Sequence, residues 1–142
     1  MKNRNLNNID DWATPAEFYK TLNDEFNFDF DPCPLNYQVD NSSIFSKWGE
    51  RNFINPPYSR KLKELFIVKA NYEAKNGNLC VMLLPVSTST KIFHDIILPN
   101  AKIRFIKGRI KFLGVNTKGE YVTNKCGMHD SMLVIFDGRL NK

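Results

Sequence analysis

The sequence predicts an α/β fold in which helices alternate with the strands of a mostly parallel sheet. A continuous apolar run, Leu79–Pro85, has the length and the turn-like borders of a strand that is buried on both faces. Apolar residues recur at helical spacing over 59–76, before this strand, and a second helix is expected at 88–98, after it. Strands and helices that alternate along a chain indicate a parallel sheet covered by helices.

The other elements are predicted from local signals. Thr14 and Glu17 match a capping box with Pro15 at the first helical position, which predicts a helix up to residue 26. Gly77 is expected to end the helix over 59–76, and Pro99 the helix over 88–98. The remaining expected elements are a short strand over 27–31, a loop with a helical turn over 36–50, strands over 51–55, 101–106 and 109–113, a polar loop over 114–129, and a final strand over 131–136.

Bulk properties place limits on the function. The chain has 142 residues, which fits one domain over 12–142 after a flexible polar tail, 1–11. It has no apolar run of membrane-spanning length and no signal-like N-terminus, so a cytoplasmic protein is expected. The three cysteines are far apart and predict neither a disulfide framework nor a metal site. A net charge of +5 favours a polyanionic partner.

The segment Asn55-Pro56-Pro57-Tyr58 carries the clearest chemical signal. It follows a strand, and ligands of open α/β sheets bind at the carboxyl ends of strands. The prolines remove two N–H donors, which leaves the Asn55 amide oxygen and the Pro56 carbonyl as acceptors. Two acceptors that hold an aromatic amine localise the lone pair on its nitrogen, while the Tyr58 ring offers a stacking surface. The loop therefore suits methyl transfer to an exocyclic amine; a rigid turn before a helix is the alternative interpretation.

This loop resembles motif IV of the amino-methyltransferases, (D/N/S)-P-P-(Y/F/W). Further segments lie before and after this loop. Their order resembles that of the compact phage-type Dam family of DNA N6-adenine methyltransferases, and together they span nearly the whole chain. These segments are DWATP at 11–15, FDFDP at 28–32, Trp48, the motif IV loop with Ser59, Leu84-Pro85 with Thr88, and GRIKF at 108–112. The resemblance implies an enzyme that transfers a methyl group from S-adenosylmethionine to the N6 amino group of adenine in double-stranded DNA.

The resemblance also assigns cofactor-binding residues. Its motifs imply that Trp12, Thr14 and Pro15 line the methionine side of S-adenosylmethionine, and that Asp31 and Pro32 are motif I at the tip of the first strand. Asp40 is a further candidate, for the ribose hydroxyls. The segment after Asp31 lacks the glycines of the usual D-P-x-x-G-x-G, and a loop without them approaches a cofactor less closely.

The short spacing between motifs I and IV constrains the fold. Asp31 and Asn55 are only 24 positions apart, too few for two full strand-and-helix units. We therefore expect a reduced Rossmann-like methyltransferase sheet of about five strands, with helices on both faces, a C-terminal antiparallel hairpin and no separate recognition domain.

Basic residues near the end of the chain are candidates for DNA contact. Three of them are spaced two apart and would line one side of an extended segment, as a row of phosphate contacts would; an ordinary solvated face is the alternative. Two more lie in the long polar loop, and long loops in compact domains are often functional. The candidate DNA-binding residues are Ser59, Lys107, Arg109, Lys111, Lys118 and Lys125.

Two other functions are compatible with these residues. Motif IV holds any exocyclic amine, so N4-cytosine methylation is possible on chemical grounds, and Asn at position 55 favours adenine by resemblance alone. A DNA-binding relative that has lost catalysis is the second alternative, because motif I lacks its glycines.

Overall fold

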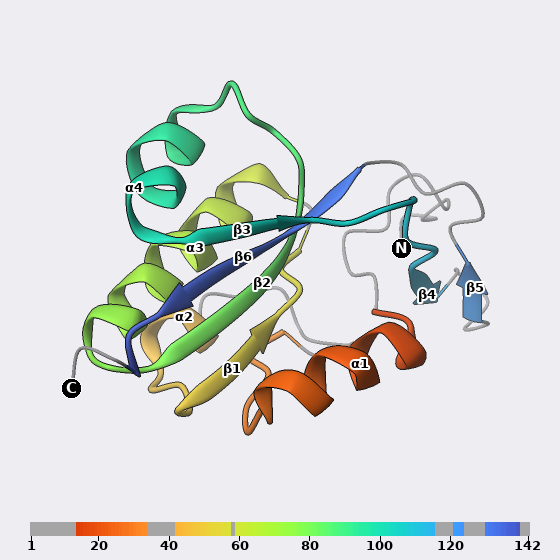
Figure 1. The fold of residues 1–142 in the computed structure, drawn as a ribbon, viewed down its shortest axis with the longest axis horizontal. Helices are drawn as coiled ribbons and strands as arrows, with labels where there is room; N and C mark the ends of the chain where they lie inside the picture. The colour runs from red at the N-terminus through yellow and green to blue at the C-terminus, as the bar shows by residue number, and fades with distance from the viewer. Residues whose placement is uncertain (1–13, 34–41, 58, 116–120, 124–129, 140–142) are drawn as a thin grey trace, which may run out of the picture.

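The computed structural model describes residues 14–33, 42–57, 59–115, 121–123 and 130–139. A four-stranded sheet lies between two layers of helix (Figure 1). Its strands, in spatial order, are β1 (Arg51–Ile54), β2 (Leu79–Pro85), β6 (Ser131–Asp137) and β3 (Lys102–Phe105). The helices are α1 (Ala16–Phe26), α2 (Ser42–Phe45), α3 (Arg60–Lys75), the π-helical turn η2 (Phe93–Ile97) and α4 (Leu98–Asn100). Strands β4 (Leu113–Val115) and β5 (Tyr121–Thr123) form a separate antiparallel pair.

The sheet is mixed, and the prediction of a mostly parallel sheet of about five strands is not confirmed. Strands β1 and β2 are parallel, whereas β6 is antiparallel to both of its neighbours, β2 and β3. The reason is the position of β6. Strands β1, β2 and β3 all run in the same direction, as alternation with helices predicts, but β6 returns between β2 and β3 and separates them. The expected C-terminal antiparallel hairpin is not formed: residues 109–112, predicted as its first strand, are not a strand, and β6 pairs instead with β2 and β3, both of which lie earlier in the chain.

A fifth segment extends the sheet on the outer side of β1. Phe30 forms a parallel bridge with Asn52, and its carbonyl accepts a hydrogen bond of 3.0 Å from the Phe53 N–H. The strand expected over 27–31 is reduced to this bridge, and its first residue, Asn27, belongs instead to the end of α1, with a left-handed conformation (φ 53°). The edge at which β1, β2 and β3 end is called the carboxyl edge below, and the Phe30 segment leaves the sheet there.

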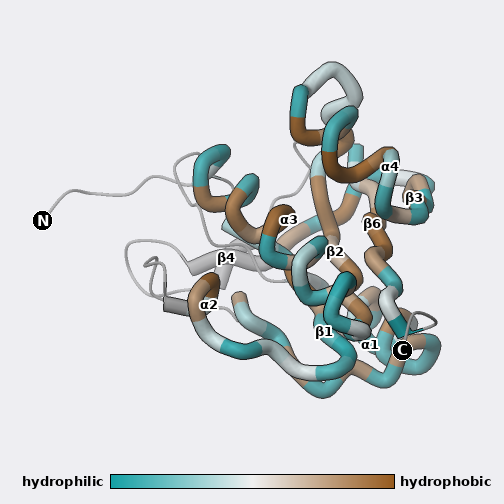
Figure 2. The backbone as a smooth tube through the Cα atoms, turned by 90° about the vertical axis from the view of Figure 1, so that its left-hand side faces the viewer, coloured by the Kyte–Doolittle hydropathy of each residue, from teal (hydrophilic) through white to brown (hydrophobic). Residues whose placement is uncertain are grey.

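Helices cover both faces of the sheet, as predicted, and each face has its own core. Helix α1 packs on one face; α3, η2 and α4 pack on the other, and the buried strands between them are strongly apolar (Figure 2). The α1-side core includes Leu22, Phe26, Phe53, Val81, Leu133, Ile135, Ile110 and Phe112. The α3-side core includes Ile54, Phe66, Ala70, Met82, Val134, Phe93 and Ile97. Strand residues alternate between these cores, as the two-residue period of a strand requires.

Several boundaries differ from the predictions. Pro99 does not stop the helix before it; it lies within the last helical turn, Leu98–Asn100, directly after the π-helical turn η2. The polar loop expected over 114–129 contains most of the β4–β5 pair. Strand β2 has the predicted bounds, and Gly77 has the positive φ (95°) expected after a helix end.

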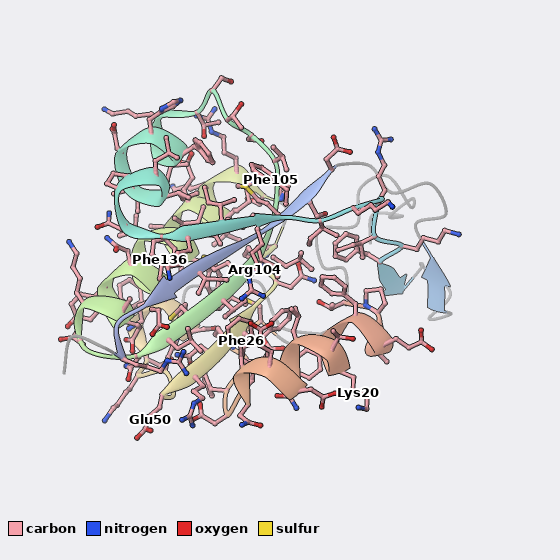
Figure 3. The ribbon with its side chains drawn as sticks, viewed as in Figure 1. Lys20, Phe26, Glu50, Arg104, Phe105 and Phe136 are labelled. Carbon is pink, nitrogen blue, oxygen red and sulfur yellow. The ribbon has the colours of Figure 1, made fainter. Side chains whose placement is uncertain are left out.

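The edge strand β3 is tied to α1 across the α1 face of the sheet. Arg104 forms two hydrogen bonds with the Glu25 carboxylate, at 2.8 and 2.6 Å, and lies over the Phe26 ring (Figure 3). The Arg104 hydrogen bond lowers the pKa of Glu25. The stabilisation is therefore present above the ordinary pKa of a glutamate and is lost as pH falls through the lowered value. Both side chains are about half exposed, so the pair contributes little to stability.

Three properties of the described segments are relevant to function. Within the described segments no helix has the length and apolar character needed to span a bilayer. No three His, Cys, Asp or Glu side chains of those segments are grouped closely enough to hold a metal ion. Cys80 is a core residue, and burial raises the pKa of its thiol to about 12.

Candidate active site

The loop after β1 is packed into the carboxyl edge of the sheet. Pro56 and Pro57 are buried and Asn55 is 8% exposed. Phe53 packs in the α1-side core and Ile54 in the α3-side core, so alternation directs the next side chain, Asn55, to the α1 side. The structure thus places the motif IV asparagine on the face of the sheet that α1 covers.

Thr14 meets Asn55 on this face. The Asn55 Nδ2 group donates a hydrogen bond of 3.2 Å to Thr14 Oγ1, between residues 41 positions apart. The predicted capping box is wrong: Pro15 is the N-cap residue of α1, and no side-chain hydrogen bond caps the helix. The Thr14 hydroxyl contacts the motif IV loop, in place of the helix end that the sequence pattern predicted.

Asp31 lies at the same edge. The parallel bridge between Phe30 and Asn52 makes the two segments leave the sheet side by side, so motif I and motif IV are neighbours. Asp31 Oδ1 accepts a hydrogen bond of 2.8 Å from the Cys33 N–H, which closes a tight turn. An aspartate side chain commonly stabilises a turn in this way. Positions 35 and 37, where the family pattern has glycines, lie outside the described residues.

Tyr19 lies near Asp31, although no motif in the sequence marks it. Burial, and then the negative charge of Asp31, raises the pKa of its hydroxyl. Its ring packs against Phe28 and Phe53, with centroids 5.8 and 5.1 Å away. Tyr19 lies one turn of helix after Pro15, which is the spacing that could have placed it on the same side of α1.

The structure describes some of the other predicted cofactor and catalytic residues and not the rest. Pro32 is buried next to Asp31, and Pro15 is half-buried at the start of α1. Trp12, Asp40 and Tyr58 lie outside the described residues, as do Lys118 and Lys125 of the candidate DNA-binding set.

The row of basic residues beyond β3 is exposed near the carboxyl edge. Arg109 and Lys111 alternate with Ile110 and Phe112, which are buried in the α1-side core. Lys107 is also exposed, but Gly108 follows it with a positive φ (79°), so the regular spacing of two starts only at Arg109. Arg109 forms an exposed ion pair with Asp130, with Nε and Oδ1 3.3 Å apart. Ser59 is exposed as the N-cap residue of α3.

The described groups near this edge are of three kinds. They are the hydrogen-bonded hydroxyl of Thr14 and amide of Asn55, the Asp31 carboxylate at the end of the neighbouring segment, and the aromatic rings around Tyr19. Polar groups of this kind beside aromatic rings fit a ligand that has a charged amino-acid part and a flat heterocycle. S-adenosylmethionine has both parts.

The comparison with protein families decides the identity. The model of the family described as DNA N-6-adenine-methyltransferase (Dam) matches residues 2–140, nearly the whole chain. The chain belongs to the Dam family. This Dam-family chain is accordingly an S-adenosylmethionine-dependent enzyme that methylates DNA at the N6 position of adenine. No curated protein and no solved structure gives a significant match. The family supports adenine rather than cytosine as the target base, and catalysis rather than its loss.

Proposed function

We propose that the chain methylates adenine in double-stranded DNA with Asn55-Pro56-Pro57-Tyr58 as its catalytic loop. The observation that carries this proposal is the position of Asn55, which is held by Thr14 at the carboxyl edge, next to the segment that ends in Asp31. Two segments that family resemblance assigns to the cofactor are thus adjacent to the one it assigns to catalysis.

The residues of the loop have distinct roles in this mechanism. The target adenine leaves the base stack, which costs a few kcal/mol, and stacks on the Tyr58 ring. The Asn55 side-chain oxygen and the Pro56 carbonyl accept the two N–H groups of its amine, which localises the lone pair on N6. Pro57 keeps the backbone rigid. Because Asn55 Nδ2 donates to Thr14, the amide plane is fixed before the substrate arrives. Such preorganisation is a major source of rate acceleration.

The cofactor-binding residues are Trp12, Thr14, Pro15, Asp31, Pro32 and Asp40 in this proposal. The Asp31 carboxylate provides a negative charge at the edge of the sheet, where it suits the cationic groups of the cofactor. When bound, S-adenosylmethionine supplies a methyl group on a positively charged sulfonium, so no strong general base is needed. DNA is held by phosphate contacts from Lys107, Arg109, Lys111, Lys118 and Lys125, with Ser59 near the target base. The enzyme acts in the cytoplasm.

Nucleoside mass spectrometry on DNA from methylation-deficient cells that express the protein tests this function. We expect N6-methyladenine and no N4-methylcytosine. Binding of S-adenosylmethionine or its demethylated product should also raise the melting temperature of the purified protein. N4-methylcytosine alone would assign the other base, and DNA binding without any methylated base would indicate an inactive relative.

Replacing Thr14 with valine is expected to lower kcat about fivefold. Valine keeps the shape of threonine but removes the hydroxyl that holds Asn55, and a lost hydrogen bond of about 1 kcal/mol corresponds to roughly this factor. The Kd for S-adenosylmethionine should rise as well, because Thr14 is also assigned to the cofactor, and Thr14→Ser should restore kcat because serine keeps the hydroxyl. Steady-state kinetics at saturating cofactor and calorimetric cofactor binding measure both quantities. A raised Kd with normal kcat would show instead that Thr14 serves the cofactor alone and does not position Asn55.

A further inference from the structure

A cavity lies at the carboxyl edge, on the opposite side of the sheet from Asn55. It has a volume of about 430 Å³ and is formed where β2 ends, between the first turns of α3 and the segment 87–93. Its floor consists of side chains of the α3-side core, among them Leu84, Phe93 and Met132. Neither the proposed methyl transfer nor the cofactor-binding residues use this cavity.

The rim of the cavity is cationic and rich in hydroxyl groups. Arg60, Lys63 and Lys91 line it, against a single carboxylate, that of Glu64. Arg60 Nε lies 3.4 Å from Glu64 Oε2, but the Arg60 side chain is 80% exposed. An exposed pair of this kind is weak and leaves the guanidinium able to exchange partners. The rim therefore has an excess of positive charge next to an apolar floor.

The hydroxyl side of the rim is held in a fixed shape. Thr90 Oγ1 donates to the Ser87 carbonyl at 3.1 Å and accepts from the Phe93 N–H at 3.3 Å. His94 Nε2 lies 2.7 Å from the Thr88 carbonyl. These contacts fasten the segment that carries Ser89 and Lys91 to the start of the following helix. A rim that is already ordered loses little conformational entropy when a ligand binds.

We infer that this cavity receives a sugar–phosphate unit of the DNA strand near the target adenine. The phosphate lies on Arg60 and Lys91, and the apolar face of the deoxyribose lies toward the floor. This assignment rests on the proposed function. Arg60 is five positions after Asn55, and five positions span at most about 18 Å. That reach corresponds to about five base-pair steps of 3.4 Å, so a phosphate within a few nucleotides of the target adenine is accessible.

The location distinguishes this contact from the predicted row at Lys107, Arg109 and Lys111. That row flanks the α1-side core, whereas Arg60 and Lys91 flank the α3-side core. The carboxyl edge therefore presents positive charge on both sides of the sheet, with the catalytic loop between them. Such an arrangement fits a DNA strand that crosses the edge of the sheet above Asn55.

The test compares two double variants of equal net charge. Arg60→Ala with Lys91→Ala removes the cavity cations, and Lys47→Ala with Lys75→Ala removes two exposed lysines near the opposite edge of the sheet. DNA affinity is measured against salt concentration on several duplexes. We expect the slope of log K against log salt to fall by about 0.9 for the cavity variant, since Arg60 and Lys91 hold one phosphate between them, and to stay near that of the parent for the control. All duplexes should weaken alike.

A second variant tests the cavity itself without changing charge. Ser89→Trp fills the space beside Lys91 and should weaken DNA binding severalfold, while cofactor binding and the melting temperature stay near those of the parent. NMR titration separates DNA from a free anion: the Lys91 and Phe93 amides should shift with a duplex and not with millimolar inorganic phosphate. Equal salt slopes for the two double variants, normal DNA binding by Ser89→Trp, or saturation by phosphate alone would each overturn the assignment.

The outcome is separable from that of the proposed function. A parent protein that methylates adenine, with a cavity variant that behaves like its control, contradicts the cavity assignment alone. A parent protein that binds DNA through the cavity but yields no methylated adenine contradicts the proposed function alone.

Discussion

Asn55→Ala is expected to lower kcat for adenine methylation by about a hundredfold or more. The Asn55 oxygen is the acceptor that we assign to the target amine, and loss of one preorganised transition-state contact has effects of this size. Binding of S-adenosylmethionine should stay within a few fold, because the Asn55 amide is assigned to the target amine and not to the cofactor. Single-turnover assays with saturating DNA and cofactor measure the chemical step directly.

The control for this variant is Asn100→Ala, which removes an exposed amide from α4, on the other side of the sheet. It should have the turnover of the parent. Turnover by Asn55→Ala within about tenfold of the parent would contradict the role of the amide. A large loss of folded protein in Asn55→Ala, by circular dichroism, would mean that the contact with Thr14 is structural first.

Asn52→Leu is expected to destabilise the protein by about 3 kcal/mol. Asn52 is fully buried in the middle of β1, where an apolar residue would be usual. Its amide accepts from the Gly49 N–H at 2.8 Å and donates to the Gly49 and Leu79 carbonyls at 2.9 and 3.0 Å. Leucine has a similar volume but leaves these backbone groups without partners, at about 1–3 kcal/mol for each buried one. Urea denaturation of the two proteins measures the difference.

Asn76→Ala is the matched control, since Asn76 also bonds to a backbone carbonyl, that of Tyr72, but is exposed. Its effect should be within about 0.5 kcal/mol. If Asn52→Leu is as stable as the parent, the turn at Gly49 does not depend on the Asn52 amide. Gly49 itself has no room for a side chain, because a Cβ there would overlap Asp29.

The sequence predicts the individual elements better than it predicts how they pair. The continuous apolar run predicted β2 with its observed bounds because a strand buried on both faces has a distinctive composition. Strand β6 is equally apolar, but apolarity does not encode direction or neighbour. The direction follows from the whole chain path, so the antiparallel insertion of β6 between β2 and β3 was not predictable from local patterns.

The candidate site shows the same limit. Motif order placed Asp31 and Asn55 near one another, and the Phe30–Asn52 bridge brings their segments together. The Thr14–Asn55 contact joins residues 41 positions apart, while the local pattern around Thr14 is that of a helix cap. A hydroxyl that can serve a helix end or a distant side chain gives the same sequence signal in both cases. Only the packing of α1 on the sheet decides between them.

The late position of β6 in the chain has a consequence for synthesis. Strand β2 ends at Pro85 and its partner β6 ends at Asp137, so 52 residues must still be added before the pairing of β2 can be completed. At about 5–20 residues per second this takes roughly 3–10 s. During that time β2 has one edge without its native partner, and an apolar edge of this kind is prone to associate with other chains. A nascent enzyme is thus most exposed to aggregation, and to capture by chaperones, shortly before its last strand emerges from the ribosome.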